Sequence, residues 1–329
     1  MSKSDKENKK SRSWFAEHVE TIVPLAFLIV FLAAFVILIS QRTSKAAIGS
    51  VQLIINKSLP YILAGMGTLF VTAMGGTDIT HGALIAFVFS VTVTVGNAIG
   101  GVFGIVAGLL CGVLSGFILG YINAKRKVPS FMVSLGLLVF FRALATMVGG
   151  TTYINLPSYV KLFGNYYISI PVVVVLYLVL RYVFHSTPFG HYVRSIGENE
   201  NAVKFSGVNV DRVKIAAFTI SGLMTAVAGI LELGTKSTLL PLTTGLGFEM
   251  SVLIAMFIGG NPVRGGYGCR IYMVVIGAFT VAIMENVLGS LLLLDTYYVQ
   301  LIKGILLIGM LFLASVLKRT TSRKVVEAN

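Results

Sequence analysis

Two short stretches place an acidic residue between a glycine and a hydroxyl residue, each at the start of an apolar segment. Residues 76–80 read Gly-Thr-Asp-Ile-Thr, and residues 247–251 read Gly-Phe-Glu-Met-Ser. Glycine lets the backbone break or pass close to another element, and a carboxylate at a new helix N-terminus accepts N–H groups that have no partner within the helix. Asp78 and Glu249 therefore fit two roles: they start helices, or they line and gate a passage.

Patterns that indicate an enzyme are absent from the sequence. The dipeptide Gly-Lys never occurs, which excludes a Walker A phosphate-binding loop, and there is no His-Glu-x-x-His, Cys-x-x-Cys or Gly-x-Ser-x-Gly. The histidines are scattered, and Cys111 and Cys269 are far apart in the chain. These spacings predict no metal site, no cofactor and no disulfide framework, so we do not expect an enzyme.

The composition indicates an integral membrane protein. Of the 329 residues, 56% are hydrophobic and only 12% are charged, against about a quarter in a soluble domain, and the mean hydropathy is +0.87. The net charge of +13 raises the question of nucleic acid. The basic residues lie at the ends of apolar segments, however, which is the pattern that membrane topology produces. We therefore expect contact with the lipid bilayer and no nucleic acid.

About ten apolar segments are candidates for membrane-spanning helices. A bilayer core of about 30 Å requires roughly 20 apolar residues in a helix, because all backbone polar groups must pair within the segment. The candidates are residues 22–39, 59–74, 83–99, 102–122, 131–148, 167–183, 215–233, 250–258, 271–294 and 299–317. The eighth is too short to cross alone. We predict an all-α membrane domain over residues 22–317, between tails at residues 1–21 and 318–329.

The basic residues predict the orientation of these segments. With the N-terminus in the cytoplasm, 19 lysines and arginines fall on the cytoplasmic side and five on the outer side. Because cytoplasmic loops carry an excess of positive charge, both termini are predicted to be cytoplasmic. The first segment follows a charged stretch and has no small-residue cleavage site, so we expect a retained helix rather than a signal peptide. The protein is thus predicted to be a multi-pass protein of the inner membrane.

The two acidic stretches also suggest an internal repeat. If the second segment pairs with the seventh and the third with the eighth, the offset is five segments, so the two halves are inverted across the membrane. Inverted repeats whose helices are interrupted by glycine build central pathways in transporters. The predicted helix breaks and pathway positions are Gly75, Gly76, Asp78, Glu249, Gly259, Gly260 and Asn286. Few other charges are expected along this passage.

The longest polar segment is a loop predicted at about residues 185–214 on the cytoplasmic side. Within it, residues 199–206 favour a short helix, and Gly207 fits the position that ends one. The apolar residues of this helix are Ala202, Val203 and Phe205. They have nothing of their own to pack on, which suits docking into a groove on a partner. A solvated loop resting on the protein's own surface fits the periodicity equally well.

This loop resembles the signature of the permease subunits of ribose-type ATP-binding-cassette (ABC) importers. The family pattern is matched by Gly197, Asn199, Glu200, Ala202, Ser206, Gly207, Val208, Val210, Arg212, Val213 and Lys214. Residues 75–82 look like the family's Gly-Gly-Ile-Asp-Leu-Ser-Val-Gly, and residues 129–136 look like its Pro-x-Phe-[Ile/Met]-Val-Thr-Leu-Gly. A further block is matched by the glycine pairs at 259–260 and 265–266. The resemblance extends from about residue 59 to residue 317.

The resemblance implies a translocation subunit that works with other chains. These are cytoplasmic ABC ATPase subunits that dock on the loop, a second permease copy or a sister permease, and an external solute-binding protein that delivers a monosaccharide. ATP hydrolysis would then occur on the partner chain. The residues expected to contact the ATPase are Asn199, Glu200, Asn201, Ala202, Val203, Phe205 and Gly207.

Two alternatives remain open from the sequence. In the first alternative, the chain is a related permease whose solute is a nucleoside, a branched-chain amino acid or a sugar-derived signal instead of a sugar. This alternative stays open because residues 201–203 and His81 depart from the family pattern. The other alternative is an ion-coupled secondary transporter, which would need acids along its pathway. Among the charges within apolar segments, Arg142 is expected to pair inside the bundle, Glu285 to bond between helices, and Lys303 to extend to the interface.

Overall fold

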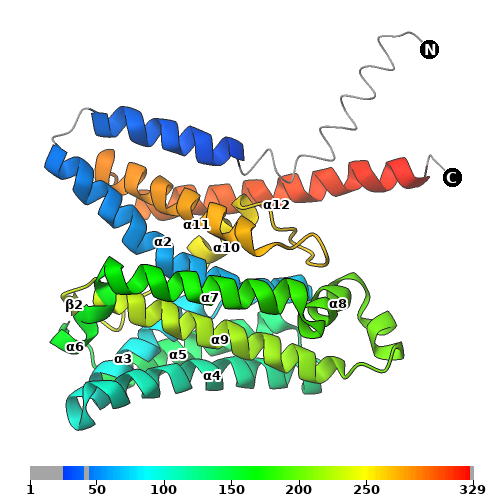
Figure 1. Ribbon diagram of the computed structural model, residues 1–329, viewed down its shortest axis with the longest axis horizontal. Coiled ribbons are helices and arrows are strands. Elements are labelled where there is room, and N and C mark those ends of the chain that lie inside the picture. Colours follow the sequence, from blue (N-terminus) through cyan, green and yellow to red (C-terminus); the bar gives the residue numbers. More distant parts are fainter. Residues whose placement is uncertain (1–24, 41–43, 327–329) are drawn as a thin grey trace.

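The structure is a computed structural model that describes residues 25–40 and 44–326. The predicted tail at residues 1–21 lies outside these ranges. Helices dominate the described chain, and most of them run lengthwise through it (Figure 1). A two-stranded antiparallel sheet pairs β1 (Ile154–Asn155) with β2 (Thr238–Leu239), with Ile154 opposite Leu239. Because each strand has only two residues and the other regular elements of the described chain are helices, the predicted all-α class is confirmed.

Seven helices of the described chain are long and apolar enough to cross a membrane. They are α2 (Ser44–Ala73), α3 (His81–Ile99), α4 (Gly101–Arg126), α5 (Ser130–Gly149), α7 (Tyr166–Ser186), α9 (Val210–Gly234) and α11 (Ile271–Glu285) with its π-helical continuation η2 (Asn286–Leu291). The remaining described elements are Leu25–Ser40, α6 (Ser158–Lys161), η1 (Leu162–Gly164), α8 (Pro188–Phe205), α10 (Phe248–Ile258) and α12 (Thr296–Val326), whose apolar part is the shorter stretch Thr296–Phe312. The predicted number of about ten spans stays a prediction.

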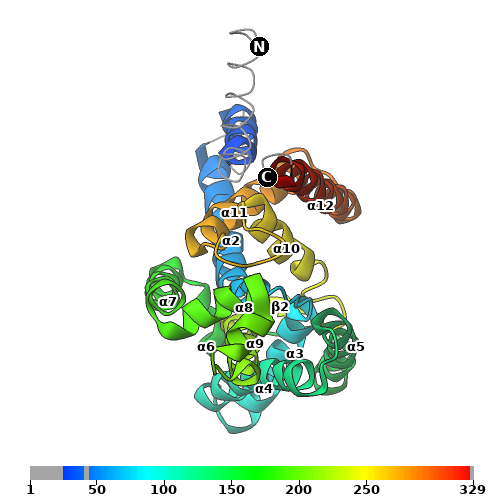
Figure 2. The same cartoon turned by 90° about the vertical axis from the view of Figure 1, so that its right-hand side faces the viewer.

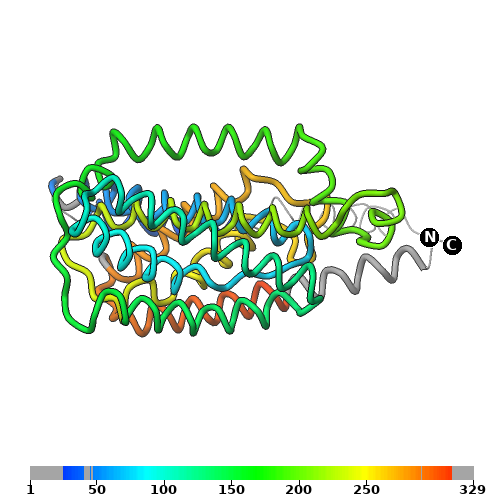
Figure 3. Tube along the Cα trace, turned by 90° about the horizontal axis from the view of Figure 1, so that it is seen from below, coloured from blue at the N-terminus to red at the C-terminus, as the bar shows by residue number. Residues whose placement is uncertain are grey.

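Helix α2 occupies the middle of the bundle, as the end-on view shows (Figure 2). Within its most apolar stretch, 83% of the residues are buried in the protein, whereas only 22% are buried in the corresponding stretches of α5 and α7. Those two helices lie at opposite edges, and Figure 3 shows α7 running along one of them. The peripheral helices therefore present apolar surface that suits lipid, whereas α2 packs against protein on most sides.

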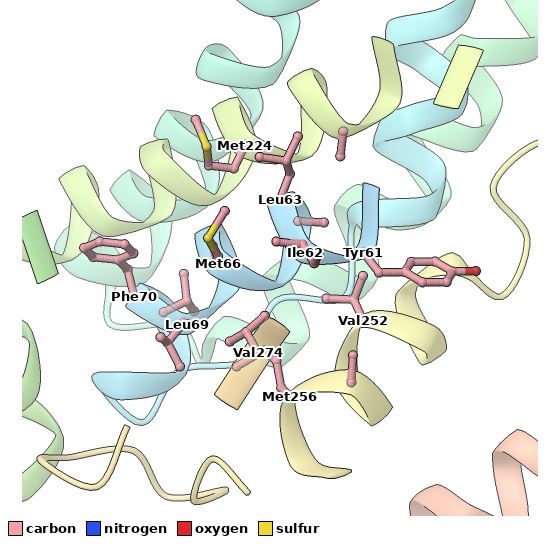
Figure 4. Packing of buried hydrophobic residues seen from close by; sticks show 14 of the residues in the cluster. Tyr61, Ile62, Leu63, Met66, Leu69, Phe70, Met224, Val252, Met256 and Val274 are labelled. Atoms are coloured by element: carbon pink, nitrogen blue, oxygen red, sulfur yellow. The ribbon is translucent and has the colours of Figure 1, made fainter. Parts of the chain in front are cut away.

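The core forms where α2 meets α9, α10 and α11 (Figure 4). Leu63 and Met66 of α2 are fully buried, with Met224 of α9 and Met256 of α10 among the neighbouring core residues. Lipid tails are as apolar as these side chains, so van der Waals packing rather than hydrophobic transfer stabilises such contacts. Close packing at α2 is therefore what fixes the shorter helix α10 in place.

A stripe of glycines allows α4 to approach α3 and α9 closely. Five glycines of α4 recur at four-residue intervals and are all buried: Gly104, Gly108, Gly112, Gly116 and Gly120. A Cβ added to Gly112 would lie 2.6 Å from the carbonyl oxygen of Gly222 in α9. Small residues at this spacing are the standard means of bringing membrane helices together.

Two predicted boundaries are corrected by the structure. The second span begins at Ser44 rather than at residue 59, because α2 continues through a polar stretch and through Pro60. A proline is tolerated inside a membrane helix when neighbouring elements satisfy the freed backbone groups. The predicted loop at residues 185–214 is mostly helical, since α7 ends at Ser186, α8 fills residues 188–205 and α9 begins at Val210.

Candidate functional site

The short helix predicted at residues 199–206 is present as the last part of α8. Asn199 has non-helical backbone angles (φ −159°, ψ 97°), so α8 is two helices joined at a kink. Its side-chain oxygen accepts a hydrogen bond from the N–H of Ala202 at 3.1 Å, which caps the second helix. Gly207 follows with φ +86°, the left-handed conformation that ends helices. Residues 199–207 are called the coupling segment below.

The coupling segment exposes part of its apolar side. Phe205 is 90% exposed and Ala202 is exposed, whereas Val203 is buried in the main core. The carboxylate of Glu200 pairs with Lys214 of α9 at 2.7 Å. The prediction that this helix has nothing to pack on is therefore wrong for Val203. One side of the segment is anchored to the bundle, and Phe205 projects away from it.

The first part of α8 holds the loop between α10 and α11. The backbone N–H of Tyr267 donates to Oε1 of Glu198 at 3.0 Å, and the hydroxyl of Tyr267 lies 2.9 Å from Ser195 Oγ. The guanidinium of Arg194 lies over the Tyr267 ring, 5.0 Å from its centre, a geometry in which the ring face attracts the cation. Residues just before the kink therefore fix Tyr267 from three directions.

The same loop holds the end of α2. The N–H of Gly266 donates to the carbonyl oxygen of Ala73 at 2.9 Å. Two residues later, Gly75 adopts φ +77°, and residues 76–80 leave the helical conformation before α3 begins at His81. The predicted break at Gly75 and Gly76 is therefore present. Continuous contacts lead from the kink in α8 through Tyr267 and Gly266 to this break.

Asp78 lies within the break and is fully engaged there. It is 3% exposed and accepts hydrogen bonds from the Thr80 N–H at 3.0 Å, the Thr80 hydroxyl at 2.7 Å and the Ser221 hydroxyl at 3.0 Å. The adjacent His81 is buried and hydrogen-bonded to Thr68 at 2.6 Å. The N-cap residue of α3 is Thr80, and its side chain does not cap the helix. Asp78 instead orders the residues just before α3 and ties them to α9.

Glu249 sits at the corresponding start of α10. Gly247, with φ +77°, is the N-cap residue, and its N–H donates to Glu249 Oε1 at 3.3 Å. A Cβ on Gly82, near the start of α3, would collide with the Gly245 carbonyl oxygen and with Glu249. The starts of α3 and α10 are therefore in contact. The other predicted break follows the end of α10 at Ile258, where Gly260 adopts φ +97°.

A cavity of about 680 Å³ is lined in part by β2, and β2 and α8 lie at opposite ends of the molecule (Figure 1). It is lined by α2, the end of α9, β2, the start of α10, η2 and α12. Its polar lining residues include Asn56, Lys57, Tyr61, Tyr153, Glu232, Thr235, Lys236, Thr238, Thr243, Thr244, Ser251, Glu285, Gln300 and Lys303. The predicted pathway residue Asn286 is 1% exposed and is not among the lining residues.

Several charged side chains line this cavity, although few charges were expected along the passage. Glu285 is 6% exposed and pairs with Lys303 at 2.5 Å and with Lys57 at 3.2 Å. Tyr61 donates to the same carboxylate at 3.0 Å, as does Ser251. The expectation that Lys303 extends to the membrane interface is wrong, because its ammonium group is buried against Glu285 and donates to Ser251 at 2.8 Å. Glu285 bonds between helices, as predicted.

Arg142 finds its partner beside this cavity. Its guanidinium, carried by α5, donates to the carbonyl oxygen of Thr244, a lining residue. A carbonyl group satisfies part of the guanidinium's hydrogen-bonding need without a counter-charge. The expected internal pairing of Arg142 is therefore present, with a backbone group as its partner.

The sequence matches a known family over most of its length. A family described as "branched-chain amino acid transport system / permease component" matches residues 50–311. The chain belongs to this family. The resemblance drawn from the loop and glycine motifs is thus confirmed, and with seven long apolar helices the chain is a multi-pass inner-membrane permease.

Several curated relatives are sugar permeases. The ribose import permease protein of Escherichia coli K12 is 29% identical over 258 residues, which cover 75% of this chain and 79% of the relative. The ribose import permease protein of Bacillus subtilis 168 is 31% identical, with coverage of 75% and 78%. The autoinducer 2 import system permease protein of Enterobacter sp. 638 is 28% identical, with coverage of 91% and 88%. No solved structure matches the chain.

Proposed function

We propose that the chain forms the translocation pathway of an ABC importer that takes up a monosaccharide or a close derivative. The observation that carries this proposal is the similarity to ribose and autoinducer 2 import permeases across three-quarters or more of the chain. The lining of the cavity supports it, because hydroxyl and amide side chains are suited to the hydrogen-bonding groups of a sugar. The similarity to import permeases does not favour the ion-coupled alternative.

The coupling segment is the proposed docking site of a cytoplasmic ATPase. Phe205, Ala202 and Asn201 are exposed beside the anchored Val203. An exposed aromatic residue on a short capped helix fits the groove-binding mode of helical recognition. The residues around the segment, such as Lys125, Lys127 and Lys214, are basic, which supports a cytoplasmic location for this end under the positive-inside rule. Cytoplasmic tails at residues 1–21 and 318–329 are part of the proposal.

The opposite end, with the cavity, would face the external solute-binding protein. The contact between the starts of α3 and α10 supports two inverted repeats that meet inside the bundle. A second copy of the chain or a sister permease would complete the passage, as the resemblance to importer permeases implies. These parts of the proposal follow from the family and from the positions of the two sites at opposite ends.

Reconstitution of the complete importer in proteoliposomes tests the proposal. Uptake of labelled sugar must require ATP, the ATPase subunits and the binding protein, with no dependence on an ion gradient. Uptake by the purified chain alone would refute it. A pull-down of the ATPase tests the docking site: Phe205→Asp should abolish capture, while Leu162→Asp, which changes another exposed apolar residue at the other end of the molecule, should leave it intact.

A further inference from the structure

The charged residues in the cavity do not balance. Three lysines and two glutamates line it: Lys57, Lys236, Lys303, Glu232 and Glu285. Glu285 serves two lysines, and Glu232 pairs with Lys236 at 2.6 Å. Among the described lining residues, one positive charge therefore has no carboxylate of its own. A charge in partly desolvated surroundings is stabilised by a counter-charge, which a ligand can supply.

Two of these lysines are accessible from the cavity. The side chains of Lys57 and Lys236 are 45% and 36% exposed, whereas that of Lys303 is 10% exposed and is held by Glu285 and Ser251. Lys303 therefore completes the buried pair with Glu285, and the surplus charge is carried by Lys57, while Lys236 is accessible although Glu232 balances its charge. Each ammonium group has three N–H donors and contacts one carboxylate, so donors remain for a ligand.

The remaining lining favours a ligand with many hydroxyl groups. Glu232 Oε2 is buried and has no hydrogen-bond partner in the described structure. Pro60 lacks an N–H, so the carbonyl oxygen of Asn56, four residues earlier in α2, receives no intrahelical hydrogen bond from it. Both Asn56 and Pro60 line the cavity. These groups accept hydrogen bonds, as sugar hydroxyls require.

We propose that this cavity binds a monosaccharide that carries a single carboxylate, with Lys57 and Lys236 as the contacts of that carboxylate. The inference rests on the proposed function and names its substrate class. A monoanion matches the one surplus charge, whereas a sugar phosphate, with close to two charges, would exceed it. A volume of about 680 Å³ lies within the range of small-molecule sites.

Binding of matched sugar pairs to the purified full-length chain in lipid nanodiscs tests the inference. The probes are galactose with galacturonate, glucose with glucuronate, and mannose with mannuronate, each pair differing by one carboxylate. At least one acid should bind ten-fold or more tightly than its neutral partner. Lys57→Gln and Lys236→Gln should each reduce this preference at least five-fold, and the control Lys161→Gln, an exposed lysine outside the cavity, should not change it.

Salt dependence guards against a variant that misfolds. Acid binding by the unchanged protein should weaken between low and high ionic strength, while binding of the neutral sugar stays constant. Equal affinities within every pair, or an equal effect of Lys161→Gln, would overturn the inference. ATP-driven uptake of neutral sugars with no uptake of the acids would overturn it and leave the proposed function standing. Selective acid binding without any ATP-driven uptake would instead contradict the proposed function.

Discussion

Replacement of Glu285 tests how the membrane-embedded charges stabilise the fold. Glu285 and Lys303 are 6% and 10% exposed and pair at 2.5 Å, and Tyr61 and Ser251 also contact the carboxylate. Removing one partner of a buried pair costs about 3–5 kcal/mol, because the other charge stays buried without compensation. Glu285→Leu should therefore lower the free energy of unfolding by about this amount.

The partner variants separate the pair from the packing around it. Lys57 is 45% exposed, so Lys57→Leu should cost less than about 1 kcal/mol. The double variant Glu285→Leu with Lys303→Leu leaves no buried charge unpaired, because the remaining lysine, Lys57, is 45% exposed, and it should recover much of the stability lost by Glu285→Leu. The assay is equilibrium unfolding in mixed micelles with increasing denaturing detergent. A loss below about 1 kcal/mol for Glu285→Leu, or no recovery in the double variant, would refute the reasoning.

Three further outcomes are expected. Glu198→Ala removes the acceptor of the Tyr267 N–H, so ATP hydrolysis by the complete importer should continue while sugar uptake per ATP falls several-fold; unchanged coupling would contradict this link. Gly112→Leu should prevent close packing of α4 on α9 and reduce the yield of folded protein in detergent, whereas Gly136→Leu, which meets open space, should not. Gly75→Ala places a side chain on a residue with φ +77°, which should lower the free energy of unfolding by about 1–2 kcal/mol and so lower the midpoint of thermal unfolding.

Local signals in the sequence were sufficient to predict the helices and the coupling segment. Apolar runs and glycine pairs depend only on neighbouring residues, so the breaks at Gly75 and Gly260 and the short helix that begins at Asn199 could be placed from the sequence. The start of α2 was missed because polar residues such as Asn56 and Lys57 interrupt the apolar pattern before residue 59. Such residues do not end a helix that packs in the middle of a bundle, where neighbours satisfy their polar groups.

The cavity could not be predicted, because its pairs join distant parts of the chain. Lys57 and Glu285 are 228 positions apart, and nothing in either local sequence indicates the other. A partial signal did exist: Glu285 and Lys303 are opposite charges in consecutive apolar segments, and an acid within a span requires a partner. The four-residue spacing of glycines in α4 was a second readable signal, since it marks close helix packing.

Helix α10 connects the two ends of the molecule. Its first turn lines the cavity through Phe248 and Ser251, and its last residue, Ile258, precedes the loop that Glu198 holds against α8. Eleven residues of helix extend for about 16 Å, enough to join the cavity to the half of the bundle that carries α8. Glycines with positive φ lie on both sides, Gly247 before the helix and Gly260 after it. A short rigid helix between two such points can transmit a displacement as a unit, so we expect a displacement of α8 by the proposed ATPase to reach Ser251, and with it the Glu285–Lys303 pair, through α10 and the part of α2 that packs on it.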